Sequence, residues 1–222
     1  MPKTIAFIPI RSGSKSIPNK NIRVFNGKPL VHWSIEAALN CELIDRVVIA
    51  SDYQKKDIGY TNNSSKIEYY QRDSNNAQDT SSTESVMLEY LENSAHSEND
   101  LFILIQATNP FFNSEDLQKA LLSRSEGASM LSCSRVKRFF WNDDGTPLNY
   151  DYFKRPRRQD FKGILMENGA FYINTIKGII NAKNRMSNPV EIYEMPEFAQ
   201  FEIDEESDWI VAENLHQKYI LS

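Results

Sequence analysis

The sequence predicts an α/β fold, with one mostly parallel sheet covered by helices on both faces. Three observations lead to this prediction. Short apolar runs alternate with stretches of helical periodicity, the run at residues 101–105 is apolar throughout, and no internal repeat interrupts the order. Alternation of this kind is typical of parallel sheets, whose strands are buried on both faces. Because 222 residues can bury a substantial core, we expect residues 1–222 to form a single domain.

The expected strands are short and rich in β-branched residues. The run RVVIAS reads as a buried strand, and LFILI has the continuous apolar character of a central strand. Strands are expected at residues 5–10, 46–51, 67–71 and 101–105, and regular structure returns at residues 164–173 and 190–195.

The expected helices are marked by apolar spacing and by capping residues. Leu30, Trp33 and Ala37 recur at helical intervals. Ser114 resembles an N-cap, because the carboxylates of Glu115 and Asp116 would lie in the first turn and complement the helix dipole. Helices are therefore expected at residues 30–39, at 83–91, after Ser114, and at 207–215.

The alternation stops between residues 135 and 161. This stretch holds the adjacent aromatics Phe139, Phe140 and Trp141, a turn at residues 143–145, and the cationic run KRPRR at residues 154–158. It is expected to be an insert that leaves the sheet. Three adjacent aromatics are costly to expose and often mark an interface, although they can also fold back as a satellite core.

Composition excludes several classes of protein. Hydrophobic residues make up 41% and charged residues 25% of the chain, which is ordinary for a globular protein. A net charge of −5 argues against a general nucleic-acid binder, but cations focused in one cleft can still bind an anionic nucleotide.

Cys41 and Cys133 lack metal-site spacing. The first apolar run is too short for a signal peptide, and no run has the length of a membrane span. We therefore expect a cytoplasmic, reduced protein that binds no membrane.

The loop after the first strand carries the strongest chemical signal. Residues 8–21 read IPIRSGSKSIPNKN, so small residues are interspersed with cations. Backbone N–H groups in such a loop form an anion-binding concavity, and small side chains let a phosphate approach. The alternative is a polar loop with solvated lysines. Neither the Walker A pattern nor the dinucleotide pattern occurs here. The predicted phosphate contacts are Arg11, Ser12, Gly13, Ser14, Lys15 and Lys20.

Six blocks in order make the chain resemble the acylneuraminate cytidylyltransferases, the family that makes CMP-sialic acid and related CMP-nonulosonates. They are IPIRSGSKSIPNKN at residues 8–21, Arg72 followed by DTSST at 79–83, IQATNP at 105–110, RRQD at 157–160, NGAFY at 168–172 and EIDEESDW at 202–209. Together they cover almost the whole chain. The resemblance implies a Rossmann-like sheet of the nucleotide-diphospho-sugar transferase type, with a dimerisation insert at about residues 135–161.

The resemblance implies that CTP and a nonulosonic acid of sialic, legionaminic or pseudaminic type give the CMP-sugar and pyrophosphate. Lys20 and Arg11 would be catalytic, with Lys20 stabilising charge at the transferred phosphorus. Asn21, Arg72 and Thr83 would surround the cytidine, although Arg72 could equally be a surface cation. Asp79 could contact the nucleotide or cap the following helix.

The resemblance also implies a magnesium site at Asp204 and Glu202. Carboxylates two residues apart face one side of an extended strand, and Mg²⁺ usually takes one or two carboxylates together with waters and phosphates. The alternative is an acidic surface run. Asp208 is expected to support the start of the last helix.

The acid substrate needs a cationic partner, and Arg158 could bind its carboxylate bidentately. Gln106, Asn168 and Tyr172 would contact the acylamide and glycerol-like arm. The alternative for the arginine run is a solvated or nucleic-acid-binding patch. Family resemblance further implies a homodimer in which the insert packs on the partner and Arg158 reaches the sugar bound there. The three histidines are scattered and are expected to be structural or exposed.

The chain departs from the family pattern at several positions. Ser16 replaces a glycine, Ala107 and Asn109 replace proline and serine, and Glu202 replaces the first aspartate of D-x-D, while Phe111 and Phe112 follow the Gln106 block. These departures leave two alternatives to the main interpretation. One is a nucleotidyltransferase for Kdo or a sugar phosphate, and the other is a catalytically silent nucleotide-binding homologue.

Overall fold

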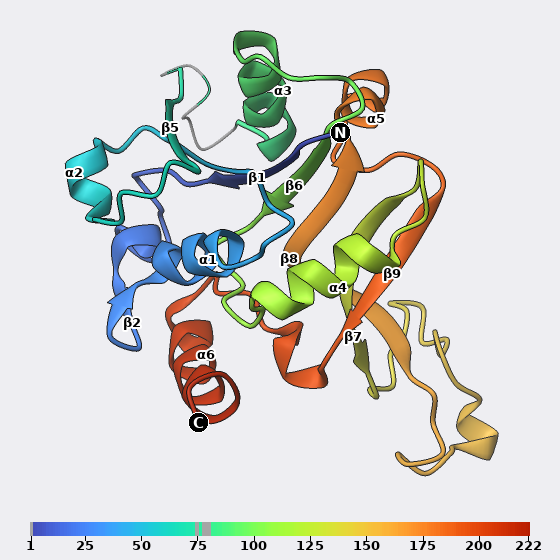
Figure 1. Ribbon diagram of the computed structural model, residues 1–222. Coiled ribbons are helices and arrows are strands. Elements are labelled where there is room, and N and C mark those ends of the chain that lie inside the picture. Colours follow the sequence, from blue (N-terminus) through green and yellow to red (C-terminus); the bar gives the residue numbers. More distant parts are fainter. Residues whose placement is uncertain (1, 74–75, 77–80) are drawn as a thin grey trace.

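The computed structural model describes residues 2–73, 76 and 81–222. Among these residues a seven-stranded sheet forms the centre of the molecule, with strand order β5-β4-β1-β6-β8-β7-β9 (Figure 1). The strands are β1 (Thr4–Pro9), β4 (Arg46–Ser51), β5 (Ile67–Gln71), β6 (Leu101–Ile105), β7 (Ser129–Val136), β8 (Ile164–Thr175) and β9 (Val190–Met195). A short two-stranded sheet joins β2 (Val24–Phe25) to β3 (Lys28–Pro29).

The sheet is mostly parallel, as predicted. Strands β5, β4, β1 and β6 run parallel to one another, and β9 runs parallel to β7. Strand β8 lies antiparallel between β6 and β7, with Leu104 opposite Tyr172. The reversal of β8 and the existence of β7 were not predicted. The parallel strands place their carboxyl ends at one edge, where the loops that follow β1, β4 and β6 come together.

Four of the observed helices lie close to predicted positions, whereas the short helices at Lys55–Ile58 and Ile176–Ala182 were not predicted. The helices are α1 (Leu30–Leu39), α2 (Lys55–Ile58), α3 (Thr83–Asn93), α4 (Ser114–Ser123), α5 (Ile176–Ala182) and α6 (Glu206–Tyr219), with short 3-10 turns at Lys20–Ile22, Tyr152–Lys154 and Glu197–Gln200. The predicted N-cap Ser114 is wrong by one residue. Asn113 instead caps α4, and its side chain accepts hydrogen bonds from the backbone N–H groups of Glu115 and Asp116. The Asp116 carboxylate in turn accepts from the Asn113 N–H, which completes a capping box.

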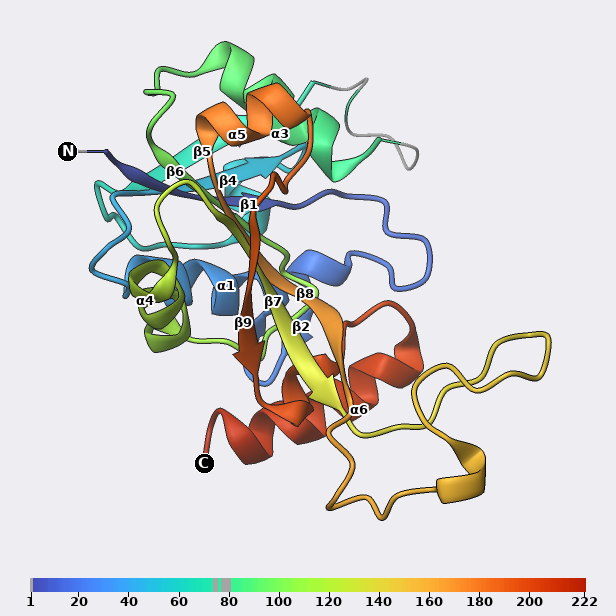
Figure 2. The same cartoon turned by 90° about the vertical axis from the view of Figure 1, so that its right-hand side faces the viewer.

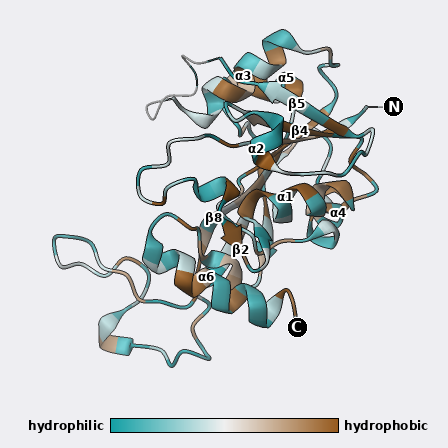
Figure 3. Cartoon of the chain, turned by 90° about the vertical axis from the view of Figure 1, so that its left-hand side faces the viewer, coloured by the Kyte–Doolittle hydropathy of each residue, from teal (hydrophilic) through white to brown (hydrophobic). Residues whose placement is uncertain are grey.

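Helices cover both faces of the sheet (Figure 2). On one face, α3 and α5 pack over Phe7 and Phe102. On the other face, α1, α4 and α6 enclose a larger core that includes Phe25 and Trp209. Figure 3 shows hydrophobic segments gathered in this interior and hydrophilic segments along the outlying loops. His216 of α6 is fully buried beside Phe25, and this burial lowers its pKa to about 4.

The insert lies between β7 and β8 and projects away from the sheet (Figures 1 and 2). Strand β7 continues to Val136, so the excursion begins slightly later than residue 135. Its aromatic rings contact one another, with Phe139 centred 4.3 Å from Tyr150 and Trp141 centred 5.7 Å from Tyr152. Trp141 is still 49% exposed and Phe153 81% exposed. The aromatics therefore form a cluster inside the insert that is only partly shielded from solvent.

The described part of the chain has no helix that is both long and apolar enough to cross a membrane. Cys41 and Cys133 are buried and form no disulfide within the part of the chain that the structure describes. Burial raises the pKa of the Cys133 thiol to about 11, with Glu167 and Glu194 adding to the shift.

Candidate active site

A cleft of about 190 Å³ opens where β1 and β6 end and α3 begins. It brings together residues from three of the six sequence blocks. The predicted residues that line it are Arg11, Ser14, Lys20, Asn21, Arg72, Thr83 and Gln106. Most of the predicted nucleotide-binding residues and one predicted sugar contact therefore share a single cleft. Ser12, Gly13 and Lys15 belong to the same loop but do not line the cleft.

The loop after β1 is tied to the end of β4. The Ser12 backbone N–H donates to Asp52 Oδ1 at 2.7 Å, and the Ser12 hydroxyl donates to the other carboxylate oxygen. Gly13 has a φ of +71°, a left-handed conformation that favours glycine. The Asn21 amide donates to the Arg11 carbonyl oxygen at 3.2 Å and fixes the other end of the loop. Sequence reasoning missed Asp52, although it directly follows a buried parallel strand.

Lys20 connects this loop to the predicted metal carboxylates. Its side chain is buried, and its Nζ donates to the Ile203 carbonyl oxygen at 2.6 Å. The same Nζ lies 3.2 Å from Asp204 Oδ1. A buried ammonium group held by a backbone oxygen and a carboxylate is a positioned cation, so Lys20 is not one of the solvated lysines of the alternative interpretation.

Arg72 is buried beneath the cleft and is therefore not a surface cation. Its guanidinium donates to the carbonyl oxygens of Ile10, at 3.2 Å, and Asn76. Burial lowers its pKa, while the carboxylates of Asp52 and Glu89 oppose the shift. Among the described residues the Arg72 Nε has no hydrogen-bond partner.

Helix α3 begins at Thr83 on the wall of the cleft. Its N-cap is Ser82, whose hydroxyl accepts a hydrogen bond from the Ser85 N–H at 3.0 Å. The cap considered for Asp79 is thus provided by Ser82, and Asp79 itself lies outside the described residues.

Glu202 and Asp204 both approach Lys20, but they do not lie on a strand as expected. Glu202 turns inward against Gly169, where a Cβ atom would lie 1.7 Å from Glu202 Oε1. Burial raises the pKa of Glu202, and the charges of Asp204 and Glu167 add to the shift. Asp204 is exposed.

Asp208 supports the start of α6, as predicted. Its carboxylate accepts hydrogen bonds from the backbone N–H groups of Asp204, at 3.1 Å, and Glu205, at 2.8 Å. Within the described ranges no group of three or more His, Cys, Asp or Glu side chains has an arrangement that could hold a metal ion.

The predicted sugar contacts do not converge in the way the nucleotide contacts do. Arg158 lies in the insert and pairs with Glu197 at 3.0 Å, both side chains being exposed. Asn168 is fully buried and donates to the Ala199 carbonyl oxygen at 3.0 Å. Tyr172 is 3% exposed, and its hydroxyl donates to Glu167. Within the chain as described, Gln106 is the member of this set that lines the cleft.

One departure from the family pattern has a clear structural use. Asn109 is fully buried, and its amide donates to the Asn168 and Ala199 carbonyl oxygens at 2.6 and 2.9 Å. It therefore joins the loop after β6 to β8 and to the turn at Glu197–Gln200. Nothing in the structure explains Ser16, whose hydroxyl is exposed and 3.4 Å from Glu205 Oε1.

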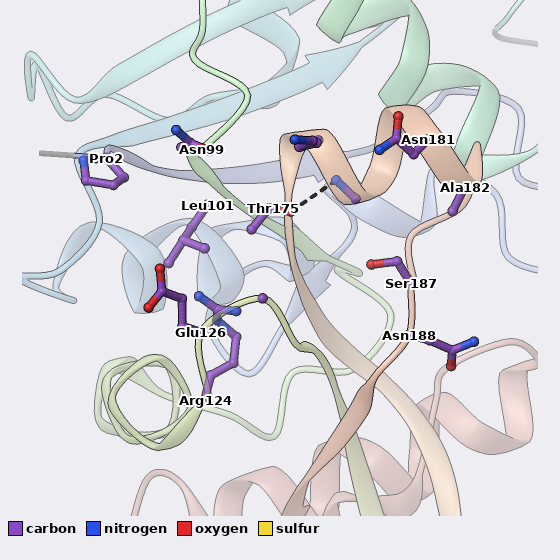
Figure 4. A pocket seen from close by; sticks show the side chains of 13 residues that line it. Pro2, Asn99, Leu101, Arg124, Glu126, Thr175, Asn181, Ala182, Ser187 and Asn188 are labelled. Carbon is purple, nitrogen blue, oxygen red and sulfur yellow. Dashed lines mark hydrogen bonds between the residues drawn. The ribbon is translucent and has the colours of Figure 1, made fainter.

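A second cavity, of about 850 Å³, lies beside the start of β6 and the end of β8. Figure 4 shows Arg124 and Glu126 on one side of it and Asn181, Ser187 and Asn188 on the other. None of the predicted site residues lines this cavity. Its greater size therefore does not make it the better candidate for the predicted chemistry.

A mostly parallel sheet with a cation-lined cleft at the carboxyl ends of its strands defines an α/β protein whose cleft is suited to anionic ligands. The family model described as Cytidylyltransferase matches residues 5–222. The chain therefore belongs to the cytidylyltransferase family, and the family resemblance of its sequence blocks is confirmed.

Individual relatives agree with this assignment. The chain is 35% identical to the N-acylneuraminate cytidylyltransferase of Oncorhynchus mykiss over 94% of its own length and 49% of that protein. It is 28% identical to the pseudaminic acid cytidylyltransferase of Campylobacter jejuni over 97% of both chains. The chain thus spans about half the length of the fish relatives that it matches, including one from Danio rerio.

Solved structures support the fold. CMP:2-keto-3-deoxy-manno-octonic acid synthetase complexed with CTP matches with a TM-score of 0.68 at 17% identity, over 97% of this chain and 99% of that one. 4-Diphosphocytidyl-2C-methyl-D-erythritol synthase from Anaerococcus prevotii gives the same TM-score and identity over 97% of this chain and 96% of that one. At this level of identity the likeness concerns the fold alone.

Proposed function

We propose that the protein joins CTP and a nonulosonic acid to give the CMP-sugar and pyrophosphate. The observation that carries this proposal is the convergence of Arg11, Lys20, Arg72 and Gln106 on one cleft at the carboxyl ends of the strands. The family assignment supplies the cytidylyl transfer. Relatives named for N-acylneuraminate and pseudaminic acid support an acceptor of the nonulosonate class.

The cleft suits a reaction that depends on positioning and on charge neutralisation. The anomeric C2 hydroxyl of the acid attacks the α-phosphorus of CTP, the bond to the β,γ-diphosphate breaks, and pyrophosphate leaves. Arg11 and Lys20 compensate the negative charge that develops on the transferred phosphoryl group. Asn21, Arg72 and Thr83 orient the cytidine. No covalent intermediate with the enzyme is required.

The cofactor of this reaction is proposed to be Mg²⁺, held by Glu202 and Asp204. A pair of carboxylates fits Mg²⁺, which completes its coordination with waters and substrate phosphates. Asp208 supports the backbone at Asp204, and Glu202 is fixed against Gly169. When bound, the ion would neutralise part of the negative charge of the triphosphate. Lys20, from the loop after β1, contacts Asp204 Oδ1.

The assembly is proposed to be a homodimer formed through the insert at residues 135–161. The exposed rings of Trp141 and Phe153 support this, because exposed aromatics are enriched at interfaces. Arg158 is exposed and is not among the residues that line the cleft of its own chain. A partner's insert could therefore supply it to the sugar. A cytoplasmic location, where CTP is present, is part of the same proposal.

The test is pyrophosphate release from CTP with a panel of acids. Purified protein is incubated with CTP, Mg²⁺ and N-acetylneuraminic, legionaminic or pseudaminic acid, and the CMP-sugar is identified by mass. We expect one of these acids to give a much higher kcat/KM than Kdo or a sugar phosphate. Turnover with Kdo or a sugar phosphate alone would favour the related nucleotidyltransferase. CTP binding without pyrophosphate release for every acceptor would identify a silent homologue.

A further inference from the structure

Four side chains form a charged network next to the cleft. The Tyr172 hydroxyl donates to Glu167 Oε1, and the Arg185 guanidinium lies 4.9 Å from the centre of the Tyr172 ring. Arg185 also donates from Nε to Glu84 Oε1 at 2.5 Å. The network thus joins β8, the segment after α5 and the first turn of α3.

This network borders the proposed reaction centre. Glu84 directly follows Thr83, which lines the cleft. Glu202 packs against Gly169, which lies on β8 two residues from Glu167. The network therefore lies between the start of α3 and the carboxylates of residues 202–204. We assign this side of the reaction centre to the acceptor and call it the acceptor side.

Within the network, the exposure of each side chain distinguishes the residue that can contact a ligand from the residues that position that residue. Tyr172 is 3% exposed and its hydroxyl is already engaged, so it cannot present that hydroxyl to a sugar without breaking its bond to Glu167. The side chains of Arg185 and Glu84 are only 20% and 21% exposed and are paired with each other. Glu167 is exposed.

We propose that Glu167 is a specificity-determining residue, and that its carboxylate accepts a hydrogen bond from a hydroxyl or amide N–H group of the acceptor sugar. Tyr172 is its positioning residue, and the Arg185–Glu84 pair fixes the Tyr172 ring. This inference rests on the proposed function, because it assigns part of the acceptor subsite of that reaction.

The chemistry of a carboxylate makes this contact selective. An ionised carboxylate only accepts hydrogen bonds, so it favours ligand groups that donate them. Tyr172 engages Oε1, so the second carboxylate oxygen is the one that would accept from a donor on the acceptor. A hydrogen bond to a charged group contributes more than one between neutral groups. An acceptor with a hydroxyl or amide donor at that position would thus bind better than its deoxy analogue.

The experiment compares Glu167→Gln with Glu194→Gln, a matched change at an exposed carboxylate on β9 that pairs with Arg135 outside the network. Wild type is first assayed with the three nonulosonic acids, and the best of these is the acceptor used. We expect Glu167→Gln to raise the KM for that acid about tenfold or more, with the KM for CTP and the melting temperature unchanged. Glu194→Gln should leave both KM values unchanged.

Two further measurements separate direct contact from a structural effect. Tyr172→Phe should raise the acceptor KM in the same direction by a smaller factor, because Glu167 loses the group that orients it. Among deoxy analogues of the acid, we expect one, which lacks the group that Glu167 contacts, to have the same high KM with wild type and with Glu167→Gln. An unchanged acceptor KM in Glu167→Gln, or an equal rise for CTP, would overturn the inference. Failure of wild type with every nonulosonic acid would instead overturn the proposed function.

Discussion

The two sides of the cleft are built in different ways. On the nucleotide side, predicted residues from distant blocks meet in one cavity and are linked by hydrogen bonds, such as those from Asn21 to Arg11 and from Arg72 to Ile10. On the acceptor side, the predicted residues are dispersed. Arg158 is exposed in the insert, whereas Asn168 is fully buried behind the cleft.

This difference follows from topology. Parallel strands bring their carboxyl ends to one edge of the sheet, so side chains that follow β1 and β6 converge there whatever their spacing in the sequence. Apart from Gln106, which follows β6 and lines the cleft, the predicted acceptor-side residues lie on the reversed strand β8 and on the insert that precedes it. Their distance from the reaction centre depends on the path of the insert, and in the proposed dimer also on a second chain.

The largest expected effect comes from Lys20→Ala on the nucleotide side. We expect kcat to fall about 10²–10³-fold, the loss typical of removing one group that stabilises transition-state charge. The measurement is pyrophosphate release at saturating CTP and acceptor, with circular dichroism to verify the fold. Lys15→Ala is the matched control, because Lys15 is exposed and outside the cleft lining. Equal losses in the two variants would remove the distinction between Lys20 and the rest of the loop.

A smaller loss of activity is expected from Asp204→Asn. Asp204 lies between the nucleotide side and the acceptor side of the site. Removing one carboxylate from the proposed magnesium pair should lower activity about 10–100-fold and abolish its response to added Mg²⁺. Asp208→Asn is the comparison, since it weakens the capping box of α6 and should cost about 0.5–2 kcal/mol of stability while Mg²⁺ dependence persists. Full activity of Asp204→Asn at ordinary Mg²⁺ would exclude Asp204 as a ligand.

Sequence patterns predicted the parallel half of the fold better than the rest. The strands at Arg46–Ser51 and Leu101–Ile105 have the predicted bounds, because continuous apolar runs record burial on both faces. Strand β7 reads SMLSCSRV, where buried serines replace apolar residues. Its Ser132 hydroxyl accepts from the Phe171 N–H and donates to the Phe171 carbonyl oxygen. Hydrophobic periodicity cannot detect a buried strand whose buried side chains are polar and satisfied by hydrogen bonds.

The candidate site shows the same limit. Arg11 and Gln106 each follow a predicted strand directly, and both line the cleft. Sequence reasoning expected Glu202 and Asp204 to lie side by side on a strand, but Glu202 is held by its close approach to Gly169. Such long-range packing leaves no local periodicity, and the same is true of the Ser12–Asp52 bond.

Asn168→Ala tests whether a buried acceptor-side residue acts through the fold. Its amide donates to Ser134 Oγ and to the Ala199 carbonyl oxygen, so its loss should lower stability by about 1–3 kcal/mol. The acceptor KM of the folded fraction should stay near wild type. The measurement is urea unfolding with steady-state kinetics, and the exposed residue Asn181 provides the control variant Asn181→Ala. A raised acceptor KM at unchanged stability would instead make Asn168 a direct sugar contact.

The smallest expected signal concerns Arg158 and distinguishes a shared site from a self-contained one. Arg158→Ala loses an exposed pair with Glu197, so stability should change by less than about 1 kcal/mol, while the acceptor KM should rise and the CTP KM should not. The decisive step mixes Arg158→Ala with Lys20→Ala at subsaturating acceptor. If the partner supplies Arg158, each mixed dimer has one site with an intact lysine and an intact arginine. Random pairing then restores about a quarter of wild-type sites. If Arg158 serves its own chain, no dimer in the mixture contains an intact site, and activity stays at the level of the separate variants. Recovery that depends on protein concentration would also measure the strength of the dimer.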